Sequence, residues 1–129
     1  MAFIDEMESI AIVLRKAGYV VATPVREDLS TNWDSLSEAE SFALKKGYID
    51  KHVAEIKLSD LVLLANYSKN GTSGYIGANS LMEAAFAYAL GVPVAYLKAI
   101  GEQPCRLEAL SISQTVIGED MREVDRLFK

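Results

Sequence analysis

Short runs of apolar and β-branched residues along the chain predict four strands, because a continuous apolar run is typical of a strand covered on both faces. The runs are residues 19–23, 60–66, 92–97 and 114–117. Elsewhere apolar residues recur every three or four positions, which predicts helices. The predicted helices are residues 5–17, 36–58, 79–90 and 119–128, with one further helical turn at 106–110.

The ends of several predicted helices match capping patterns. Ser37 followed by Glu40 forms a capping box, and Asp5 with Glu8 is a variant of the same pattern. Gly18 and Gly91 follow the first and third of these helices, where a glycine commonly terminates a helix. These residues therefore predict where the helices begin and end.

Alternation of helices and strands predicts an α/β fold, in which helices cover both faces of a parallel sheet. We expect a flavodoxin-like or Rossmann-like three-layer sandwich with a parallel sheet of about four strands. The chain has 129 residues, half of them hydrophobic, so residues 1–129 are expected to form a single domain. Ligands of such folds bind beyond the carboxyl ends of the strands, which makes the loops after Thr23, Tyr67 and Leu97 the candidate walls of a pocket.

Composition narrows the chemistry that the chain can perform. Its net charge of −5 argues against nucleic acid or an anionic membrane as the main partner. The lone cysteine, Cys105, excludes an internal disulfide and a cysteine-rich zinc site, and the single histidine, His52, argues against a His-based metal site or a Ser-His-Asp triad. We therefore expect no metal and no cofactor. Any catalysis would use carboxylates, amides, hydroxyls or tyrosines.

The chain carries no recognisable signal for secretion or membrane insertion. Asp5 and Glu6 stand where a secretory signal has its basic region. No apolar run approaches the roughly 18 to 20 residues that span a bilayer. A lone cysteine also fits a reducing compartment, so we expect a soluble, cytoplasmic protein.

The stretch "NGTSGYIGANSLMEAA", residues 70–85, is the main candidate for a functional site. Its three glycines let the backbone approach a ligand closely, and the helix that follows presents unpaired amides at its positive end. Glu83 is the one charged residue from Leu81 to Leu90. Together with Ser80 it matches a capping box, yet a carboxylate among apolar residues is also a candidate catalytic group. Both interpretations stay open on spacing alone.

We expect Glu83 to line a pocket at the carboxyl edge of the sheet. Asn66 and Tyr67 end the second predicted strand, where side chains suit hydrogen bonds to a ligand. The predicted substrate-binding residues are Asn66, Tyr67, Gly71, Gly77, Asn79 and Ser80.

Residues 59–65, the glycine-rich loop and the segment "SLMEAAFAYALGVPVAYL" together resemble the nucleoside 2-deoxyribosyltransferase-like superfamily. Its members have a strand that begins Ala/Ser-Asp, a loop with glycines, and a helix that carries a glutamate and leads into the next strand. The resemblance extends over residues 5–117, and its specific part runs from Ser59 to Leu97. The chain is more similar to a poorly characterised bacterial and archaeal branch, in which "NYxKNGxxxYIGxNTLME" recurs, than to the proven enzymes.

The resemblance implies an N-glycosidase or deoxyribosyltransferase that acts on a nucleoside or nucleotide, with Glu83 as the nucleophile. The glutamate attacks C1′ and expels the base, and transfer to another base or to water completes the cycle. The enzymes usually carry an aspartate at the position of Gly77 and a glycine at that of Ala85. One alternative is a non-catalytic nucleotide-binding or sensing module on the same scaffold, and another is a small oligomeric scaffold without a ligand.

Members of this superfamily also begin with a strand that the first residues, "MAFIDEM", do not resemble. We therefore expect that residues 19–23 pair directly with residues 60–66, or that another chain fills the gap. The predicted helix 79–90 carries apolar groups on every side, which would leave an exposed apolar patch on a monomer. This predicts a homo-oligomer, most simply a two-fold dimer, built on that helix.

Overall fold

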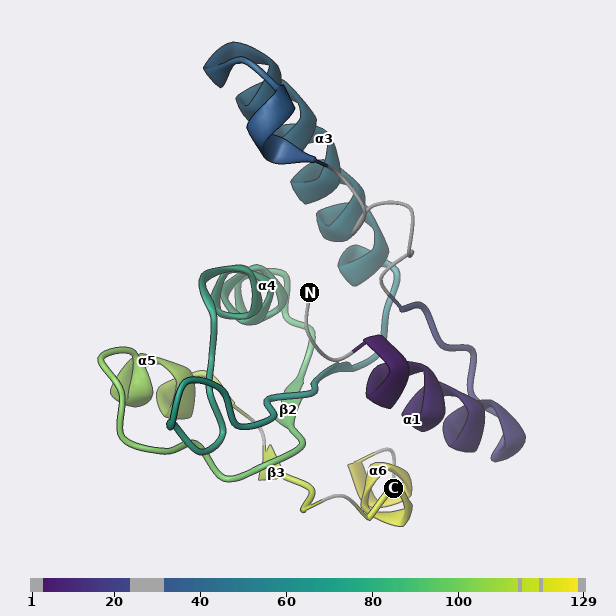
Figure 1. The fold of residues 1–129 in the computed structure, drawn as a ribbon. Helices are drawn as coiled ribbons and strands as arrows, with labels where there is room; N and C mark the ends of the chain where they lie inside the picture. Colours follow the sequence, from purple (N-terminus) through teal and green to yellow (C-terminus); the bar gives the residue numbers. More distant parts are fainter. Residues whose placement is uncertain (1–3, 24–31, 114, 119, 128–129) are drawn as a thin grey trace. The chain divides into compact units, whose positions relative to one another are not determined.

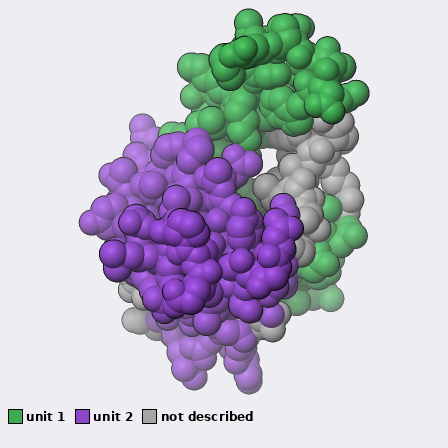
Figure 2. Space-filling view, turned by 60° about the vertical axis from the view of Figure 1, so that its left-hand side comes forward, with its two compact units in different colours: residues 1–55 green, residues 56–129 purple. Residues whose placement is uncertain are grey.

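The computed structural model describes residues 4–23, 32–113, 115–118 and 120–127. Figure 1 shows the elements that these residues form. The chain divides into two compact units, residues 1–55 and residues 56–129, which Figure 2 shows in green and purple. A single domain spanning 1–129 stays a prediction.

The first unit contains α1 (Ile4–Lys16), the short 3-10 helix η1 (Trp33–Ser35) and most of α3 (Glu38–Lys57). Helix α1 ends at Lys16, one residue earlier than predicted, and the predicted glycine, Gly18, terminates it with a φ of 101°. Its amide donates to Arg15 O at 3.0 Å and the amide of Tyr19 donates to Leu14 O at 3.1 Å. This is the paired arrangement of a Schellman motif, in which the last carbonyls of a helix are satisfied by the residues that follow it.

Of the two capping boxes predicted in the first unit, one forms. The amide of Ser37 donates to Glu40 Oε1 at 3.0 Å, and the amide of Glu40 donates to Ser37 Oγ at 3.1 Å. These hydrogen bonds from Ser37 lower the pKa of the Glu40 carboxyl below its usual range. The second prediction is wrong, because Asp5 already lies inside α1 and its carbonyl accepts a hydrogen bond from Ser9 Oγ.

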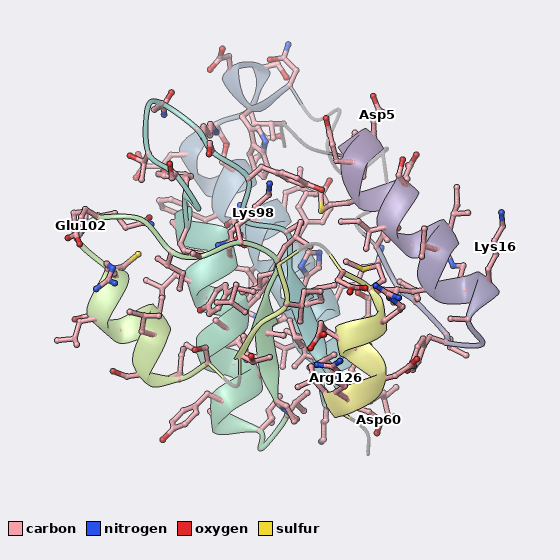
Figure 3. The ribbon with its side chains drawn as sticks, turned by 90° about the horizontal axis from the view of Figure 1, so that it is seen from below. Asp5, Lys16, Asp60, Lys98, Glu102 and Arg126 are labelled. Atoms are coloured by element: carbon pink, nitrogen blue, oxygen red, sulfur yellow. The ribbon has the colours of Figure 1, made fainter. Side chains whose placement is uncertain are left out.

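The second unit contains a three-stranded parallel sheet in the order β1-β2-β3. The strands are β1 (Val62–Leu64), β2 (Val94–Tyr96) and β3 (Thr115–Val116). Helix α4 (Ala78–Ala89) connects β1 to β2, α5 (Arg106–Ser111) connects β2 to β3, and α6 (Arg122–Leu127) follows β3. Figures 1 and 3 show α4 and α5 on one side of the sheet and α6 on the other. The α/β class predicted from the sequence is therefore confirmed.

Strand β2 forms the centre of this unit. Its residues Val94, Ala95 and Tyr96 are all buried, as a strand with partners on both edges and helices on its faces requires. The Tyr96 hydroxyl donates to Ala109 O at 3.3 Å and so ties α5 to the sheet. Burial raises the pKa of Tyr96 to about 12, which keeps this phenol neutral and able to donate its proton. The core around it consists of Ile56, Leu64, Ile76, Ala84, Ala87, Val92, Val94, Tyr96, Ile100 and Ala109.

The prediction of a strand at residues 19–23 is wrong. These residues form no strand, and the sheet has three strands instead of about four. The side chain of Val20 is fully exposed, and the carbonyl of Val21 accepts a hydrogen bond of 2.8 Å from Arg15 Nη2. A run of β-branched residues becomes a strand only when another strand pairs with it. Here the backbone of the run instead accepts a hydrogen bond from a side chain at the end of α1.

The three other predicted strands form in shorter versions, and Gln114 of the last one lies outside the described residues, as do Glu119 and Phe128 of the predicted closing helix. Helix α4 begins one residue earlier than predicted and ends at Ala89, before Gly91 with its φ of 76°. Among the described residues, no helix combines the length and the apolar character that crossing a bilayer needs.

Candidate functional site

Two loops stand next to each other at the carboxyl edge of the sheet, one after β1 and one after β2. Asn66, in the first loop, is buried with 3% of its surface exposed. Its Nδ2 donates to Lys98 O at 2.8 Å, and its Oδ1 accepts from the amide of Lys98 at 2.8 Å. The side chain of Asn66 therefore bridges the two loops, with one donor and one acceptor bond to the same residue, as a paired strand residue would. The structure gives it a structural task, and its predicted contact with a ligand stays a prediction.

We expect Asn66→Ala to destabilise the protein by about 2 kcal/mol, because it removes both hydrogen bonds between the buried side chain of Asn66 and the backbone of Lys98. The midpoint and slope of urea unfolding measure this change. Asn79→Ala is the matched control, since Asn79 is exposed on α4 and alanine has the higher helix propensity. Equal unfolding midpoints for the two variants would contradict the bridging role of Asn66.

Gln103 joins the same two loops a second time. Its Oε1 accepts a hydrogen bond of 2.9 Å from the amide of Ile76, and its Nε2 donates to Gly74 O at 3.0 Å and to Gly101 O at 3.2 Å. The amide of Gly101 also donates to Ser73 O at 2.8 Å. The loops therefore form one interconnected layer whose geometry does not depend on a ligand. Nothing in the spacing of the sequence had marked Gln103.

Gly71 belongs to a tight turn at the tip of the first loop. Lys69 and Thr72 exchange backbone hydrogen bonds of 3.1 and 2.9 Å. The two residues between them, Asn70 and Gly71, have φ values of 52° and 76°. Two successive positive φ values define a type I′ turn, for which Asn-Gly is the preferred sequence. The turn explains this glycine without a ligand, and its predicted contact with substrate is untested.

The predicted capping box at the start of α4 does not form. Helix α4 begins at Ala78 with Gly77 as its N-cap, so Ser80 is already the third helical residue. Glu83 therefore lies in the second turn of the helix, and the first turn contains no acid. This removes the capping explanation for Glu83, which was the main structural alternative to a functional role.

Glu83 lies beside the buried side of α4. Ala84 and Ala87 are fully buried against the sheet, and Glu83 precedes Ala87 by one helical turn. Its own side chain is half-buried. Asn79 and Ser80 lie four and three residues before it, which places them next to it on the helix surface. Helix geometry thus brings three predicted site residues together at the N-terminal half of α4.

Tyr67 and two lysines are further polar groups of the two loops. Lys98 Nζ lies 5.6 Å from the centre of the Tyr67 ring, and Lys69 Nζ lies 5.9 Å from that of Tyr75. Both distances suit a cation–π contact. In Figure 3, Lys98 lies near the strands, whereas Glu102 points outward from the far end of the same loop. Neither lysine was predicted from the sequence as a residue of the site.

Two other features bear on what this edge can bind. Within the part of the chain that the structure describes, no three His, Cys, Asp or Glu side chains gather in a way that could hold a metal ion. A shallow depression of about 510 Å³ lies between α4 and α5, and none of the predicted site residues lines it. Its lining is Leu81, Ala85, Leu107, Glu108, Ser111 and Ile112.

Comparison with protein-family models, curated proteins and solved structures finds no match to this chain.

Proposed function

We propose that this protein binds a nucleoside or nucleotide at the carboxyl edge of its sheet and cleaves the N-glycosidic bond with Glu83 as the nucleophile. The observation that carries the proposal is the position of Glu83. It is half-buried in the second turn of α4, beside the buried face and away from any capping position. No other carboxylate occurs between Leu61 and Gly101, which include the loop after β1, α4, β2 and the first part of the loop after β2.

The chemistry requires a carboxylate that meets an electron-poor sugar carbon in a partly dry site. A Glu83 oxygen attacks C1′, the bond from C1′ to the base nitrogen breaks, and the base leaves with the bonding electrons and gains a proton. The resulting glycosyl ester is then attacked at C1′ by water or by a second base, which frees the carboxylate. The apolar residues of α4 around Glu83 reduce the hydration of the carboxylate, which favours its use as a nucleophile.

The second candidate is a binding or sensing module without catalysis. It is favoured by the isolation of Glu83 along the sequence, since glycoside hydrolysis usually employs a second carboxyl group that protonates the leaving group. The loops supply only one further carboxylate, Glu102, whose side chain is 94% exposed. The two candidates share the ligand class and differ in whether the base is released.

A two-step experiment tests both candidates. The first step is a thermal-shift screen over nucleosides, 2′-deoxynucleosides and their 5′-monophosphates, because ligands that bind only the folded state raise the unfolding temperature. The second step is a chromatographic assay for free base with each compound that binds. Binding with base release supports the glycosidase, binding without release supports the module, and no binding by any compound contradicts both.

We further propose that the fold is the flavodoxin-like three-layer sandwich and that the protein is a two-fold dimer. The parallel order β1-β2-β3 is what one half of such a sheet would have. On the outer side of α4, Tyr88 is 64% exposed, and on α5 Leu107 is 72% exposed. Large exposed apolar residues near the depression between these helices favour contact with a second copy.

In this dimer, Phe86 is not an interface residue, because it packs against the core of the second unit. We expect Tyr88→Glu and Leu107→Glu to convert the protein to a monomer of 14.1 kDa, since each places a charge in an apolar contact. Light scattering at micromolar concentration measures the mass. Val20→Glu is the control, because Val20 is exposed but belongs to the first unit. A monomeric wild-type protein, or a dimer that survives both substitutions, would refute this interface.

A further inference from the structure

We propose that Asn70, at the tip of the loop after β1, is a site of spontaneous deamidation, where the asparagine converts to aspartate or isoaspartate without an enzyme. The inference is independent of the proposed function, because it concerns the chemistry of the type I′ turn itself and no ligand takes part. It rests on the residue that follows Asn70, on the exposure of the turn and on the few bonds that close it.

The reaction joins the side chain of Asn70 to the backbone of Gly71. The backbone nitrogen of Gly71 loses its proton to a base and attacks Cγ of Asn70. A bond from that nitrogen to Cγ forms, the bond from Cγ to Nδ2 breaks, and the leaving nitrogen takes up the proton as ammonia. Water then opens the five-membered imide ring. Cleavage at Cγ gives aspartate, whereas cleavage at the backbone carbonyl carbon gives isoaspartate, in which the main chain runs through the side chain.

Both reacting residues are accessible. Asn70 and Gly71 are exposed at the tip of the turn. Apart from the two neighbouring residues, no atom lies within 4 Å of the position that a Cβ on Gly71 would take. The side of the backbone on which a larger residue would carry its side chain is therefore empty, which allows a close approach to the nitrogen of Gly71. Water and base reach the same atoms from solvent.

The turn must open before the ring can close, because the imide needs a backbone conformation other than the left-handed one of Asn70, with its φ of 52°. The contact that opposes opening is local. Lys69 and Thr72 form an isolated bridge of two backbone hydrogen bonds outside the sheet. The bonds that join the two loops lie on either side of this bridge, at Asn66 and from Ser73 onward. The tip can therefore open while those bonds persist, and local openings of this kind cost little free energy.

The three other asparagines of the chain each precede a residue whose side chain hinders attack by its nitrogen: Asn32, Asn66 and Asn79. Asn66 is also buried, and both polar atoms of its side chain are bonded to Lys98. Asn79 lies in the first turn of α4, which holds its backbone in place. Asn70 combines a following glycine with an exposed turn, so we expect it to convert first.

Deamidation changes both the charge and the shape of the tip. The new carboxyl group is ionised at neutral pH, so each event adds one negative charge to a chain whose net charge is −5. Isoaspartate also adds a methylene group to the main chain. A two-residue turn has a fixed geometry that cannot absorb this extra length, so we expect the hydrogen bonds between Lys69 and Thr72 to be lost.

The test follows the full-length protein during incubation at mildly alkaline pH. Acidic digestion and mass spectrometry compare its peptides with standards that carry asparagine, aspartate or isoaspartate at position 70, and ion exchange detects the added charge. We expect Asn70 to convert at least about tenfold faster than each other asparagine, and to convert more slowly in mildly acidic buffer because the attacking nitrogen must lose its proton. Failure of Asn70 to convert within several weeks, or an equal rate at another asparagine, overturns the inference.

Two variants separate the causes. Gly71→Ala should slow the conversion about tenfold or more, because its methyl group obstructs the attack even though strain at positive φ favours opening of the turn. Ser80→Gly gives Asn79 a following glycine inside α4, and Asn79 should still convert at least about threefold more slowly than Asn70, because the helix must open first. Undiminished conversion in Gly71→Ala would exclude attack by the nitrogen of residue 71. Equal rates at Asn79 of Ser80→Gly and at Asn70 would overturn the role of the exposed turn.

Discussion

Replacement of Glu83 by glutamine is expected to lower base release by about 10³-fold or more while ligand affinity changes little. Glutamine has the size of glutamate but cannot form and release a glycosyl ester, so the covalent step is lost. Glutamine has nearly the helix propensity of glutamate and keeps the length of its side chain, so α4 loses little by the substitution. The variant should therefore fold normally, and binding by titration can be compared directly with base release by chromatography.

Glu102→Gln is the matched control for this experiment. It removes one carboxylate from the neighbouring loop at a side chain that is 94% exposed, and its ion pair with Arg106, at 3.7 Å, is a surface contact. We expect base release by this variant to equal that of the wild type. If Glu83→Gln retained wild-type turnover, catalysis through a covalent bond to this residue would be excluded. A parallel loss in both variants would indicate an effect of net charge instead of a nucleophile.

The sequence predicted the elements that depend on local patterns. The Ser37–Glu40 box forms with both reciprocal hydrogen bonds, and the glycines after α1 and α4 adopt the positive φ values that end a helix. The apolar runs at β1 and β2 become neighbouring parallel strands, because each is followed by a helix that returns the chain in the same direction. In the caps and helix ends the decisive interactions lie within a few residues of each other, whereas the paired strand residues, such as Val62 and Val94, are far apart in the sequence and are brought together by the intervening helix.

The errors arose where distant residues decide the outcome. Residues 19–23 have the composition of a strand, but a strand also needs an edge to pair with, and the composition carries no information about that edge. Ser80 and Glu83 have the spacing of a capping box, yet the N-cap of α4 is Gly77, three residues before the expected cap. The loop before α4 is held by the hydrogen bond between Ile76 and Gln103, which lie 27 residues apart in the sequence.

The candidate site shows the same difference between local contacts, which the sequence predicts, and distant ones, which it does not. The sequence singled out Glu83 as a candidate, and its proximity to Asn79 and Ser80 follows from helical spacing alone. It did not identify the bridge from Asn66 to Lys98, because those residues are 32 positions apart and meet only when β1 pairs with β2. An asparagine just after an apolar run is a weak signal of such a bridge in a single sequence. Its place at the carboxyl end of a parallel strand is nevertheless where such bridges can form.

The second large effect is expected for a substitution at Gly74, where the two loops are in contact. A Cβ at this position would overlap the carbonyl oxygen of Ala99 and lie 2.9 Å from its carbonyl carbon. Both are backbone atoms of a loop that Asn66 and Gln103 hold in place, so the loop cannot easily move aside. Gly74 also has a φ of 58°, which costs an alanine free energy even without a clash. We expect Gly74→Ala to destabilise the protein by about 3 kcal/mol.

Two further glycine variants separate the causes of this loss. Gly71→Ala also introduces a Cβ at positive φ, but no atom lies within 4 Å of that Cβ, so we expect a cost of only about 1 kcal/mol. Gly47→Ala lies within α3, where no atom obstructs the Cβ, and should stabilise the protein by about 0.5 to 1 kcal/mol. Urea unfolding of the three variants should therefore give midpoints that rise from Gly74→Ala through Gly71→Ala to Gly47→Ala. If Gly74→Ala cost no more than Gly71→Ala, the strain of positive φ would account for the whole effect, and the two loops would not be packed as closely as the structure has them.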